Sequence, residues 1–401
     1  MHSETWQRFF TAETVRALAY PPPGIWMQRV PPGAVNLAAG YPFPESVPVQ
    51  EMQEAFARLA LAEGDRPFQY AGSDAMAGLD RLLTDGLRAR GLWRPGDAVL
   101  VTAGALQALD LLCRVILDGH VAALVEAPTY MEALEVLRNY TPHLRGVPVG
   151  PHGLEVEALG RLLHTAGPGE PRPRLLYTGP TFQNPTGTTL PEAARRTLLD
   201  LAEQFDFLIA EDAAYAELFF SPPPPALKQL DTGGRVIHIG SLSKVIAPGL
   251  RIGWAVGPAP VIEAMALYKK DLDHPFSRAL VGEYLRGTDL EARLQRLRAA
   301  YRERAARLVQ ALRAHMPEGV TWTEPAGGYF VWLTLPEPVP EEDLLAAARA
   351  EGVAYVPGRH FYLPGEAPSR ARLRLSFSYA PPEALDEGVR RLGAALRRFL
   401  R

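Results

Sequence analysis

The chain has 401 residues, of which 47% are apolar and 22% are charged, and its formal net charge is -3. This balance is typical of a folded protein and excludes a largely disordered one, and the slight acidic excess gives no reason to expect a nucleic-acid partner. No apolar run approaches the roughly 18 residues that span a bilayer, and the first residues lack the pattern of a secretion signal. We therefore expect a cytoplasmic protein that does not contact a membrane.

Two residue types are scarce. Cys113 is the single cysteine, so it forms no internal disulfide or thiolate metal site, and we expect no metal and a place for it in the core. The chain contains only four lysines, Lys228, Lys244, Lys269 and Lys270. Arginine stays protonated at neutral pH, so any chemistry that needs an amine nucleophile must use one of these four.

The chain begins with a proline-rich segment, residues 1–45, which indicates an extended arm after a short helix. From Asp97 onwards, short apolar runs alternate with segments of helical spacing. The runs expected as strands are 98–103, 121–127, 174–179, 207–212 and 236–241. This alternation predicts an α/β fold with a mainly parallel sheet covered by helices on both faces. Ligands of such sheets bind beyond the carboxyl ends of the strands.

After the apolar run 254–257 the chain turns to long helices over 260–315, and then to mixed strands and helices. This order predicts an arm and the start of a small domain over residues 1–45. A large domain follows over 46–285, and a small α+β domain over 286–401. The proline-rich tract 221–230 is expected to be a loop of the large domain.

Lys244 directly follows the strand expected at 236–241, in the segment Ser241 to Gly253. A lysine at a sheet end, partly desolvated and close to Arg251, has a lowered pKa, which favours a neutral amine nucleophile. Ser241, Ser243 and Arg251 supply hydroxyl donors and a fork-shaped cation, which suit a phosphate dianion. An ordinary surface loop with a solvated lysine is the alternative for this short segment.

Three further segments occupy strand ends. Asn184 begins an Asn-Pro-Thr-Gly sequence after one strand, and Asp212 ends another, with Tyr215 three residues later. Gly104, Ala105 and Leu106 open a helix, where free backbone N–H groups bind phosphate. Each segment alone also fits a turn, a helix cap or a tight strand-helix connection. Four such segments in this order make coincidence improbable.

Taken together, these segments resemble the class I/II aminotransferases of fold-type I, which use pyridoxal 5'-phosphate (PLP). The subgroup with the greatest resemblance contains bacterial 2-aminoadipate and kynurenine aminotransferases. The segments that carry it are EAPTYMEAL, GPTFQNPTG, EDAAYAELFF, GSLSKVIAPGLRIGW, GGYFVWLTLP and RLRLSF. The resemblance runs from about residue 35 to the end and implies a large domain with a sheet of the seven-stranded type, plus a smaller α+β domain.

The resemblance assigns cofactor roles by position. It implies that Lys244 binds PLP covalently and moves the proton of the substrate α-carbon, while Asp212 pairs with the pyridine nitrogen. Tyr215 and Asn184 would hydrogen-bond the phenolate oxygen, and Tyr130 would stack on the ring. The phosphate would be bound by side chains and backbone of Gly104, Ala105, Leu106, Ser241, Ser243 and Arg251.

The resemblance also assigns substrate and partner contacts. Arg374 matches the arginine that grips the α-carboxylate, assisted by Asn184 and the backbone of Gly40. Arg370 and Arg372 share a strand face with Arg374 if the strand is regular, and only the family pattern selects Arg374. Tyr70 matches a tyrosine that reaches the partner subunit's phosphate, which implies a homodimer with composite sites.

Two departures from the family pattern concern affinity and substrate. Ala105 and Leu106 replace serine and glutamine, so one hydroxyl contact with the phosphate is lost. Residues 17–28 contain no arginine to bind an acidic side chain, and Tyr20, Trp26 and Tyr41 are candidates to line the entrance. We therefore expect apolar or aromatic amino acids as donors, or a 2-aminoadipate-like substrate as in the subgroup.

The predicted activity is transfer of an amino group from an L-amino acid to a 2-oxo acid such as 2-oxoglutarate, by a ping-pong mechanism. A PLP-dependent C–S lyase is the alternative, because nearly the same residues serve its first steps. A third hypothesis is a regulator of the MocR type. Such proteins carry a DNA-binding winged helix before an aminotransferase-like domain, and no basic helix-turn-helix sequence precedes the arm here.

Overall fold

The computed structural model describes residues 6, 8–19, 30–70, 73–165, 167, 169–270 and 274–400. Tyr20 and Trp26, two of the three aromatic residues expected at the entrance, lie outside the described residues. Within the described ranges, no helix combines the length and the apolar character that crossing a bilayer requires.

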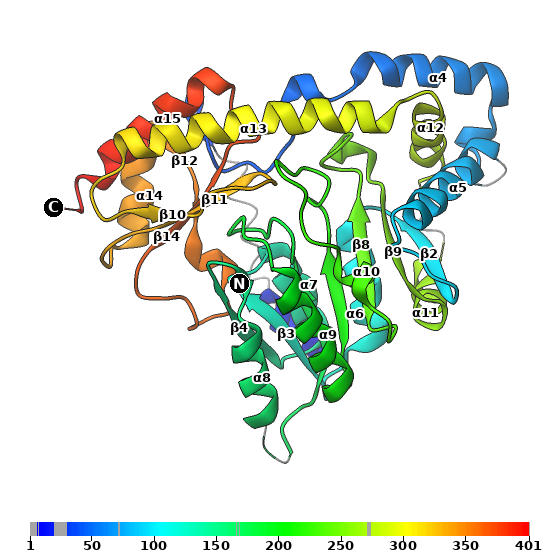
Figure 1. Ribbon diagram of the computed structural model, residues 1–401, viewed down its shortest axis with the longest axis horizontal. Helices are drawn as coiled ribbons and strands as arrows, with labels where there is room; N and C mark the ends of the chain where they lie inside the picture. Colours follow the sequence, from blue (N-terminus) through cyan, green and yellow to red (C-terminus); the bar gives the residue numbers. More distant parts are fainter. Residues whose placement is uncertain are drawn as a thin grey trace.

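A mixed sheet forms the centre of the molecule (Figure 1), and in the described chain it has eight strands in the order β2-β9-β8-β7-β6-β3-β4-β5. The strands are β2 (Asp97–Thr102), β3 (Ala122–Ala127), β4 (Leu144–Gly150), β5 (Gly153–Leu154), β6 (Pro173–Thr178), β7 (Leu208–Asp212), β8 (Val236–Ser241) and β9 (Gly253–Pro258). Strands β4, β3, β6, β7 and β8 run parallel, whereas β9 is antiparallel to both its neighbours. The predicted mainly parallel α/β sheet is therefore confirmed, with the two-residue strand β5 added at one edge.

Helices cover both faces of this sheet. One face packs against α6 (Ala105–Ile116), α7 (Met131–Tyr140) and α11 (Ala259–Lys269). The other packs against α8 (Val156–Thr165), α9 (Glu192–Phe205) and α10 (Leu227–Leu230). Within β3, Ala123 and Val125 face the first layer and Leu124 faces the second, as the two-residue period of a strand requires. Cys113 is buried in the first layer, as expected.

The tract 221–230 differs from its prediction as a loop, because it ends in the short helix α10. The cause is Glu211, a buried carboxylate at the end of β7. Its two oxygens accept the backbone N–H groups of Leu227 (2.7 Å) and Lys228 (3.1 Å), which begin the helix.

A second, antiparallel sheet has the order β10-β11-β14-β13. Its strands are β10 (Thr321–Trp322), β11 (Phe330–Thr334), β13 (Val356–Pro357) and β14 (Arg372–Ser376). It lies beside α13 (Leu290–His315), α14 (Glu341–Ala350) and α15 (Pro382–Leu396). The early strand β1 (Val35–Asn36) pairs in parallel with β12 (Val353–Ala354), so the start of the chain joins this C-terminal region. The domain boundaries at residues 45 and 285 stay a prediction.

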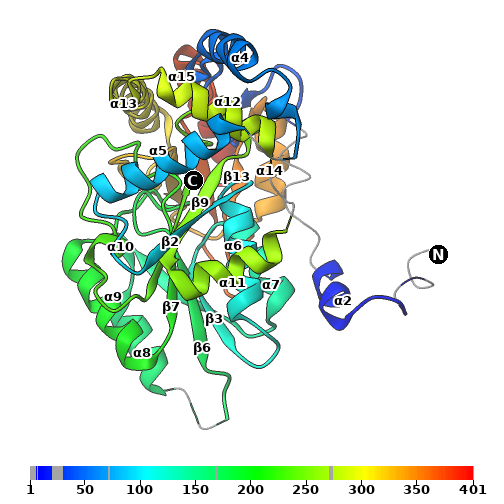
Figure 2. The same ribbon diagram turned by 90° about the vertical axis from the view of Figure 1, so that its right-hand side faces the viewer.

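Remaining helices occupy the N-terminal part and the edge near β2. They are α2 (Ala12–Leu18), α4 (Val49–Glu63), α5 (Asp74–Ala89) and α12 (Pro275–Arg286). Helix α12 packs against α4 and α5, and α2 packs against α7 to one side of the main body (Figure 2).

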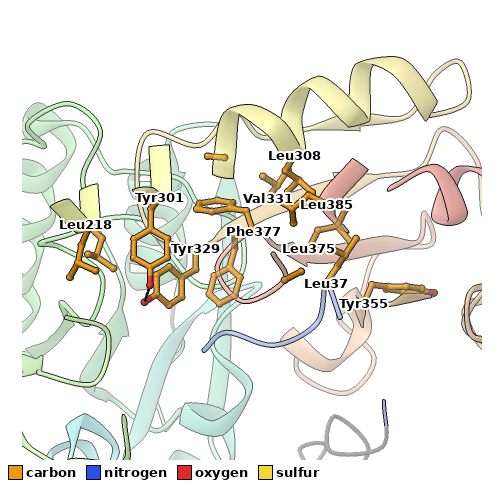
Figure 3. Close-up of a cluster of buried hydrophobic side chains, with 14 of the residues drawn as sticks. Leu37, Leu218, Tyr301, Leu308, Tyr329, Val331, Tyr355, Leu375, Phe377 and Leu385 are labelled. Atoms are coloured by element: carbon orange, nitrogen blue, oxygen red, sulfur yellow. Dashed lines mark hydrogen bonds between the residues drawn. The ribbon is translucent and has the colours of Figure 1, made fainter. Parts of the chain in front are cut away.

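The largest hydrophobic core lies under α13 and around β11 and β14 (Figure 3). Within it, the hydroxyl groups of Tyr301 and Tyr329 lie 2.8 Å apart. Tyr329 also donates a hydrogen bond of 3.1 Å to the backbone oxygen of Lys244. The core around the second sheet thus directly supports the segment that carries Lys244.

Candidate active site

A cavity of about 250 Å³ lies at the carboxyl ends of the parallel strands. Most of the residues predicted from the sequence line it. They are Ala105, Leu106, Tyr130, Asn184, Asp212, Tyr215, Ser241, Ser243, Lys244 and Arg251. A larger, mainly apolar cavity of about 630 Å³ lies behind the same strand ends and reaches Ser241, but Lys244, Asp212 and Arg251 do not line it. We therefore treat the smaller cavity as the candidate active site, because Lys244, Asp212 and Arg251 all line it.

Lys244 follows β8 and donates a hydrogen bond of 2.9 Å from Nζ to the backbone oxygen of Gly40. Burial, together with the nearby positive charge of Arg374, lowers the pKa of Lys244 from 10.5 to about 8. The amine is therefore neutral in a substantial fraction of molecules at mildly alkaline pH, as a nucleophile requires.

Asp212 ends β7 and points into the same cavity. Its Oδ2 accepts a hydrogen bond of 2.5 Å from the Tyr177 hydroxyl, and its Oδ1 accepts the N–H of Ala214 at 3.0 Å. Burial raises the pKa of Asp212, and these two hydrogen bonds oppose that rise. A cationic group opposite Asp212 would stabilise the ionised carboxylate further.

Arg374 lies on β14, and its side chain is 3% exposed. One Nη atom donates to Oδ1 of Asn184 at 2.8 Å and the other to the backbone oxygen of Ala38 at 3.1 Å. Its Nε is buried without a hydrogen-bond partner. Burial lowers the pKa of Arg374 to about 10, so the guanidinium stays charged at neutral pH. A buried cation with an unused donor and no paired carboxylate suits an anionic ligand.

The neighbouring arginines differ from Arg374 in their surroundings. Arg370 is exposed and precedes the strand, whereas Arg372 begins β14 and is partly buried. Of these three, the structure shows Arg374 hydrogen-bonded to Asn184, and Asn184 in turn lines the cavity.

A second group of donors lies at the opposite end of the cavity. Ser241 and Ser243 are buried with their Oγ atoms 2.9 Å apart. Arg251 donates to the backbone oxygen of Ala103 at 3.1 Å. Gly104 has φ +89°, and a Cβ there would lie 2.6 Å from Nη2 of Arg251. Glycine is thus needed where α6 begins, and the free N–H groups of that helix end face the same space.

Two tyrosines form walls of the cavity. Tyr215 packs edge-on against Phe330 with ring centroids 5.5 Å apart, and Nζ of Lys244 lies 5.5 Å from the Tyr215 ring centre. Tyr130 occupies the N-cap position of α7, and its hydroxyl group donates a hydrogen bond to Glu132. Burial raises the pKa of both tyrosines, so each hydroxyl is a hydrogen-bond donor at neutral pH.

Four predicted residues do not line the cavity. Arg374 reaches it only through its hydrogen bond to Asn184. Gly40 contacts Lys244 through its backbone oxygen, and Gly104 contacts Arg251, but neither lines the cavity. Tyr70 is 94% exposed and lies outside the cavity lining. Its predicted role across a dimer interface needs a second chain.

The sequence analysis missed several residues of the site. Tyr177 holds Asp212, and Glu126 is a buried carboxylate that accepts hydrogen bonds from Thr178 (2.6 Å), Gly179 (3.1 Å) and Gln183 (3.0 Å). Glu126 therefore ties the end of β3 to the turn that contains Asn184. Its position directly after an apolar strand run was the available clue. Glu132, which lines the cavity, also escaped notice.

Comparisons with known proteins agree with this geometry. The family model described as aminotransferase class I and II matches residues 32–392. The chain is 36% identical over 368 residues to aromatic-amino-acid aminotransferase 1 of Thermococcus litoralis, covering 90% of this chain and 88% of that protein. It is 37% identical over 375 residues to the 2-aminoadipate transaminase of Thermus thermophilus, covering 92% and 91%. The crystal structure of Pyrococcus horikoshii kynurenine aminotransferase, in complex with PMP, superimposes with a TM-score of 0.90 at 34% identity and 98% coverage of both chains.

Proposed function

This chain belongs to the class I and II aminotransferases, a PLP-dependent family, and on that basis we propose that it transfers an amino group from an L-amino acid to a 2-oxo acid by a ping-pong mechanism. 2-Oxoglutarate is the proposed acceptor. The observation that carries the proposal is the pairing of two groups. Lys244 is an amine of lowered pKa in the cavity wall, and Arg374 is a buried arginine with an unused donor, hydrogen-bonded to the cavity-lining Asn184. A substrate amino acid has the two complementary groups, an amine and a carboxylate, on the same carbon.

The residues present fit PLP. Ser241, Ser243, Arg251 and the start of α6 provide the donors for its phosphate, and the required glycine at position 104 keeps Arg251 within reach. Asp212 is a cavity-lining carboxylate that would pair with the protonated pyridine nitrogen, and Asn184 and Tyr215, which line the same cavity, would donate hydrogen bonds to the phenolate oxygen. When bound, PLP withdraws electrons from the substrate α-carbon and stores the amino group between the half-reactions.

The chain's own side chains perform the remaining tasks. Arg374 and Asn184 orient the substrate by its α-carboxylate, and the neutral amine of Lys244 takes and returns the α-proton. Tyr130 closes one side of the cavity. Tyr41 lines the mouth of the cavity and packs edge-on against Tyr379 with centroids 5.9 Å apart. This aromatic mouth supports an apolar or aromatic donor side chain, with a 2-aminoadipate-like donor as the alternative suggested by relatives.

We propose that the working form is a homodimer with composite sites. Phe56, Phe68 and Phe276 are partly exposed and pack together, with 5.2 Å between the stacked rings of Phe68 and Phe276. Tyr70 lies two residues after Phe68 and is 94% exposed. An exposed aromatic cluster of this kind is typical of a protein interface, and it would carry Tyr70 to the partner's phosphate site.

Complementation tests this arrangement sharply. In a dimer that mixes Lys244→Ala with Tyr70→Ala chains, one site carries both lesions and the other carries none. Refolding the two inactive variants together should restore about a quarter of the wild-type activity, since half of randomly paired dimers are mixed. No recovery from a mixture shown to form mixed dimers would contradict the composite site.

The experiment for the activity itself is a single half-reaction. Purified protein is loaded with PLP and mixed with one amino acid at a time, without any oxo acid. Loss of the PLP absorbance band, gain of the pyridoxamine phosphate band and release of one equivalent of oxo acid would support a transaminase. Continuous pyruvate and ammonia formation without an acceptor would instead identify a C–S lyase. No conversion across a broad panel would overturn the proposed activity.

A further inference from the structure

Glu132 is a carboxylate in the wall of the cavity for which the proposed reaction has no use. It lies in the first turn of α7, is partly buried, and lines the same space as Lys244 and Asp212. The start of a helix is a favourable place for an acidic side chain. The Tyr130 hydroxyl donates to its Oε2, which fixes the carboxylate at the cavity wall.

Glu132 also acts on the two groups that would anchor a substrate. Burial lowers the pKa of both Lys244 and Arg374, and the charge of Glu132 partly opposes that lowering at each group. A substrate held by its α-carboxylate at Arg374 and by its nitrogen at Lys244 therefore lies within the electrostatic reach of Glu132.

Among the described residues that line the cavity, the other two acidic side chains are already engaged. Glu126 is 2% exposed and its carboxylate accepts three hydrogen bonds from the protein. Asp212 accepts hydrogen bonds on both oxygens and is proposed to face the cofactor nitrogen. Glu132, by contrast, accepts a hydrogen bond from Tyr130 on Oε2 and, within the part of the chain that the structure describes, accepts none on Oε1, which remains for a ligand.

We propose that Glu132 determines the specificity of the substrate side chain. It favours amino acids whose side chain ends in a positive charge or a hydrogen-bond donor, and it disfavours a second carboxylate. This inference rests on the proposed aminotransferase activity, and it argues against the 2-aminoadipate-like alternative for the amino donor. A fixed carboxylate repels a substrate side chain of like charge and attracts one that ends in a hydrogen-bond donor. Specificity is the difference between the binding free energies of these two kinds of substrate.

The test compares nearly isosteric pairs of donors that differ in the group at the end of the side chain. The PLP-loaded protein is mixed with glutamine or glutamate, and with lysine or 2-aminoadipate, and kcat/KM of each half-reaction is measured. The wild type should prefer glutamine and lysine. Glu132→Gln should shift each ratio towards the acidic member by about tenfold, as expected for one unit charge at partly buried range.

Controls separate charge from structure. The variant Glu132→Gln keeps an oxygen that accepts from Tyr130, so the wall retains its shape. Glu135→Gln removes a carboxylate one turn further along α7 that does not line the cavity, and both ratios should stay within twofold of the wild type. A purely structural role of Glu132 would lower kcat/KM for both members of a pair equally.

Unchanged ratios in Glu132→Gln, or a wild type that prefers the acidic donors, would overturn the inference while the half-reaction itself still proceeds. Failure of the wild type to convert any amino acid would instead overturn the proposed function on which the inference rests.

Discussion

The Tyr177 hydroxyl donates a hydrogen bond of 2.5 Å to Oδ2 of Asp212, from one parallel strand to the end of the next. Tyr177 is buried, both residues line the cavity, and the hydrogen bond opposes the effect of burial on the pKa of Asp212. Tyr177 is therefore a positioning residue, because it acts through Asp212.

Replacing Tyr177 with phenylalanine removes that donor and keeps the ring. The pKa of Asp212 should rise, so less of it is ionised at a given pH and the acid limb of the kcat/KM profile should move to higher pH. We expect kcat/KM at neutral pH to fall about tenfold, since a hydrogen bond to a charged group contributes roughly 1.5–3 kcal/mol. Tyr140→Phe is the matched control, because it removes a 2.8 Å hydrogen bond to Asp110 outside the cavity. An identical pH profile for Tyr177→Phe would contradict the assigned role.

The lowered pKa of Lys244 predicts how the cofactor-free protein captures PLP. Only the neutral amine attacks the aldehyde, and a pKa of about 8 means that the neutral fraction rises with pH up to about 8 and then levels off. Stopped-flow absorbance across pH 6 to 10 should show a rate that follows this curve. A rate that still climbs steeply above pH 9 would mean that Lys244 titrates like an exposed lysine.

Removing the amine separates binding from turnover. Lys244→Ala should abolish turnover, while PLP still binds weakly through its phosphate and ring contacts. Equilibrium dialysis measures the binding and the half-reaction assay measures the chemistry. Substantial transamination by Lys244→Ala would refute the assignment of this lysine.

Arg374→Ala should lower kcat/KM for amino acids by about 100-fold or more, because the α-carboxylate loses a charge-assisted, two-point contact. PLP capture should change little. A simple amine without a carboxylate provides the internal comparison, since its slow reaction should not depend on Arg374. Arg370→Ala, on an exposed residue just before the same strand, should match the wild type. A fall in kcat/KM that is confined to Arg370→Ala would instead assign the binding of the α-carboxylate to Arg370.

Gly104→Ala tests the phosphate end of the cavity. The added Cβ would lie 2.6 Å from Nη2 of Arg251 in a backbone conformation with φ +89°. PLP affinity should fall about tenfold or more. Gly96→Ala has a similar backbone, φ +95°, but open space around the Cβ. It should destabilise the protein to a comparable degree on a thermal melt and leave PLP affinity unchanged, which isolates the contact with Arg251.

The sequence predicted the main sheet and most of the cavity because apolar runs mark parallel strands and the residues that follow them meet at one edge. Lys244, Asp212 and Asn184 all follow such runs, so their meeting could be anticipated. The choice of Arg374 over Arg370 and Arg372 rested on family resemblance, and the structure supplies the physical distinction, which is burial beside Asn184.

Other parts of the site had no local signature. Tyr177 shares a face of β6 with the core residue Leu175 and is indistinguishable from a core residue until β7 is placed beside it. Glu132 occupies a helix start, where an acidic residue is common for reasons of the helix dipole alone. The role of Tyr70 depends on a second copy of the chain, which no single-chain pattern specifies.

The segment between Ala38 and Gly40 contacts both cationic groups of the site, since Ala38 accepts from Arg374 and Gly40 accepts from Lys244. Ala38 and Arg374 are 336 positions apart in the chain. During synthesis Ala38 and Gly40 are translated early. Arg374 is translated only near the end, after all the residues of this subunit that are proposed to contact the cofactor. The proposed carboxylate site therefore cannot form until β14, the last strand of the described chain, has been translated.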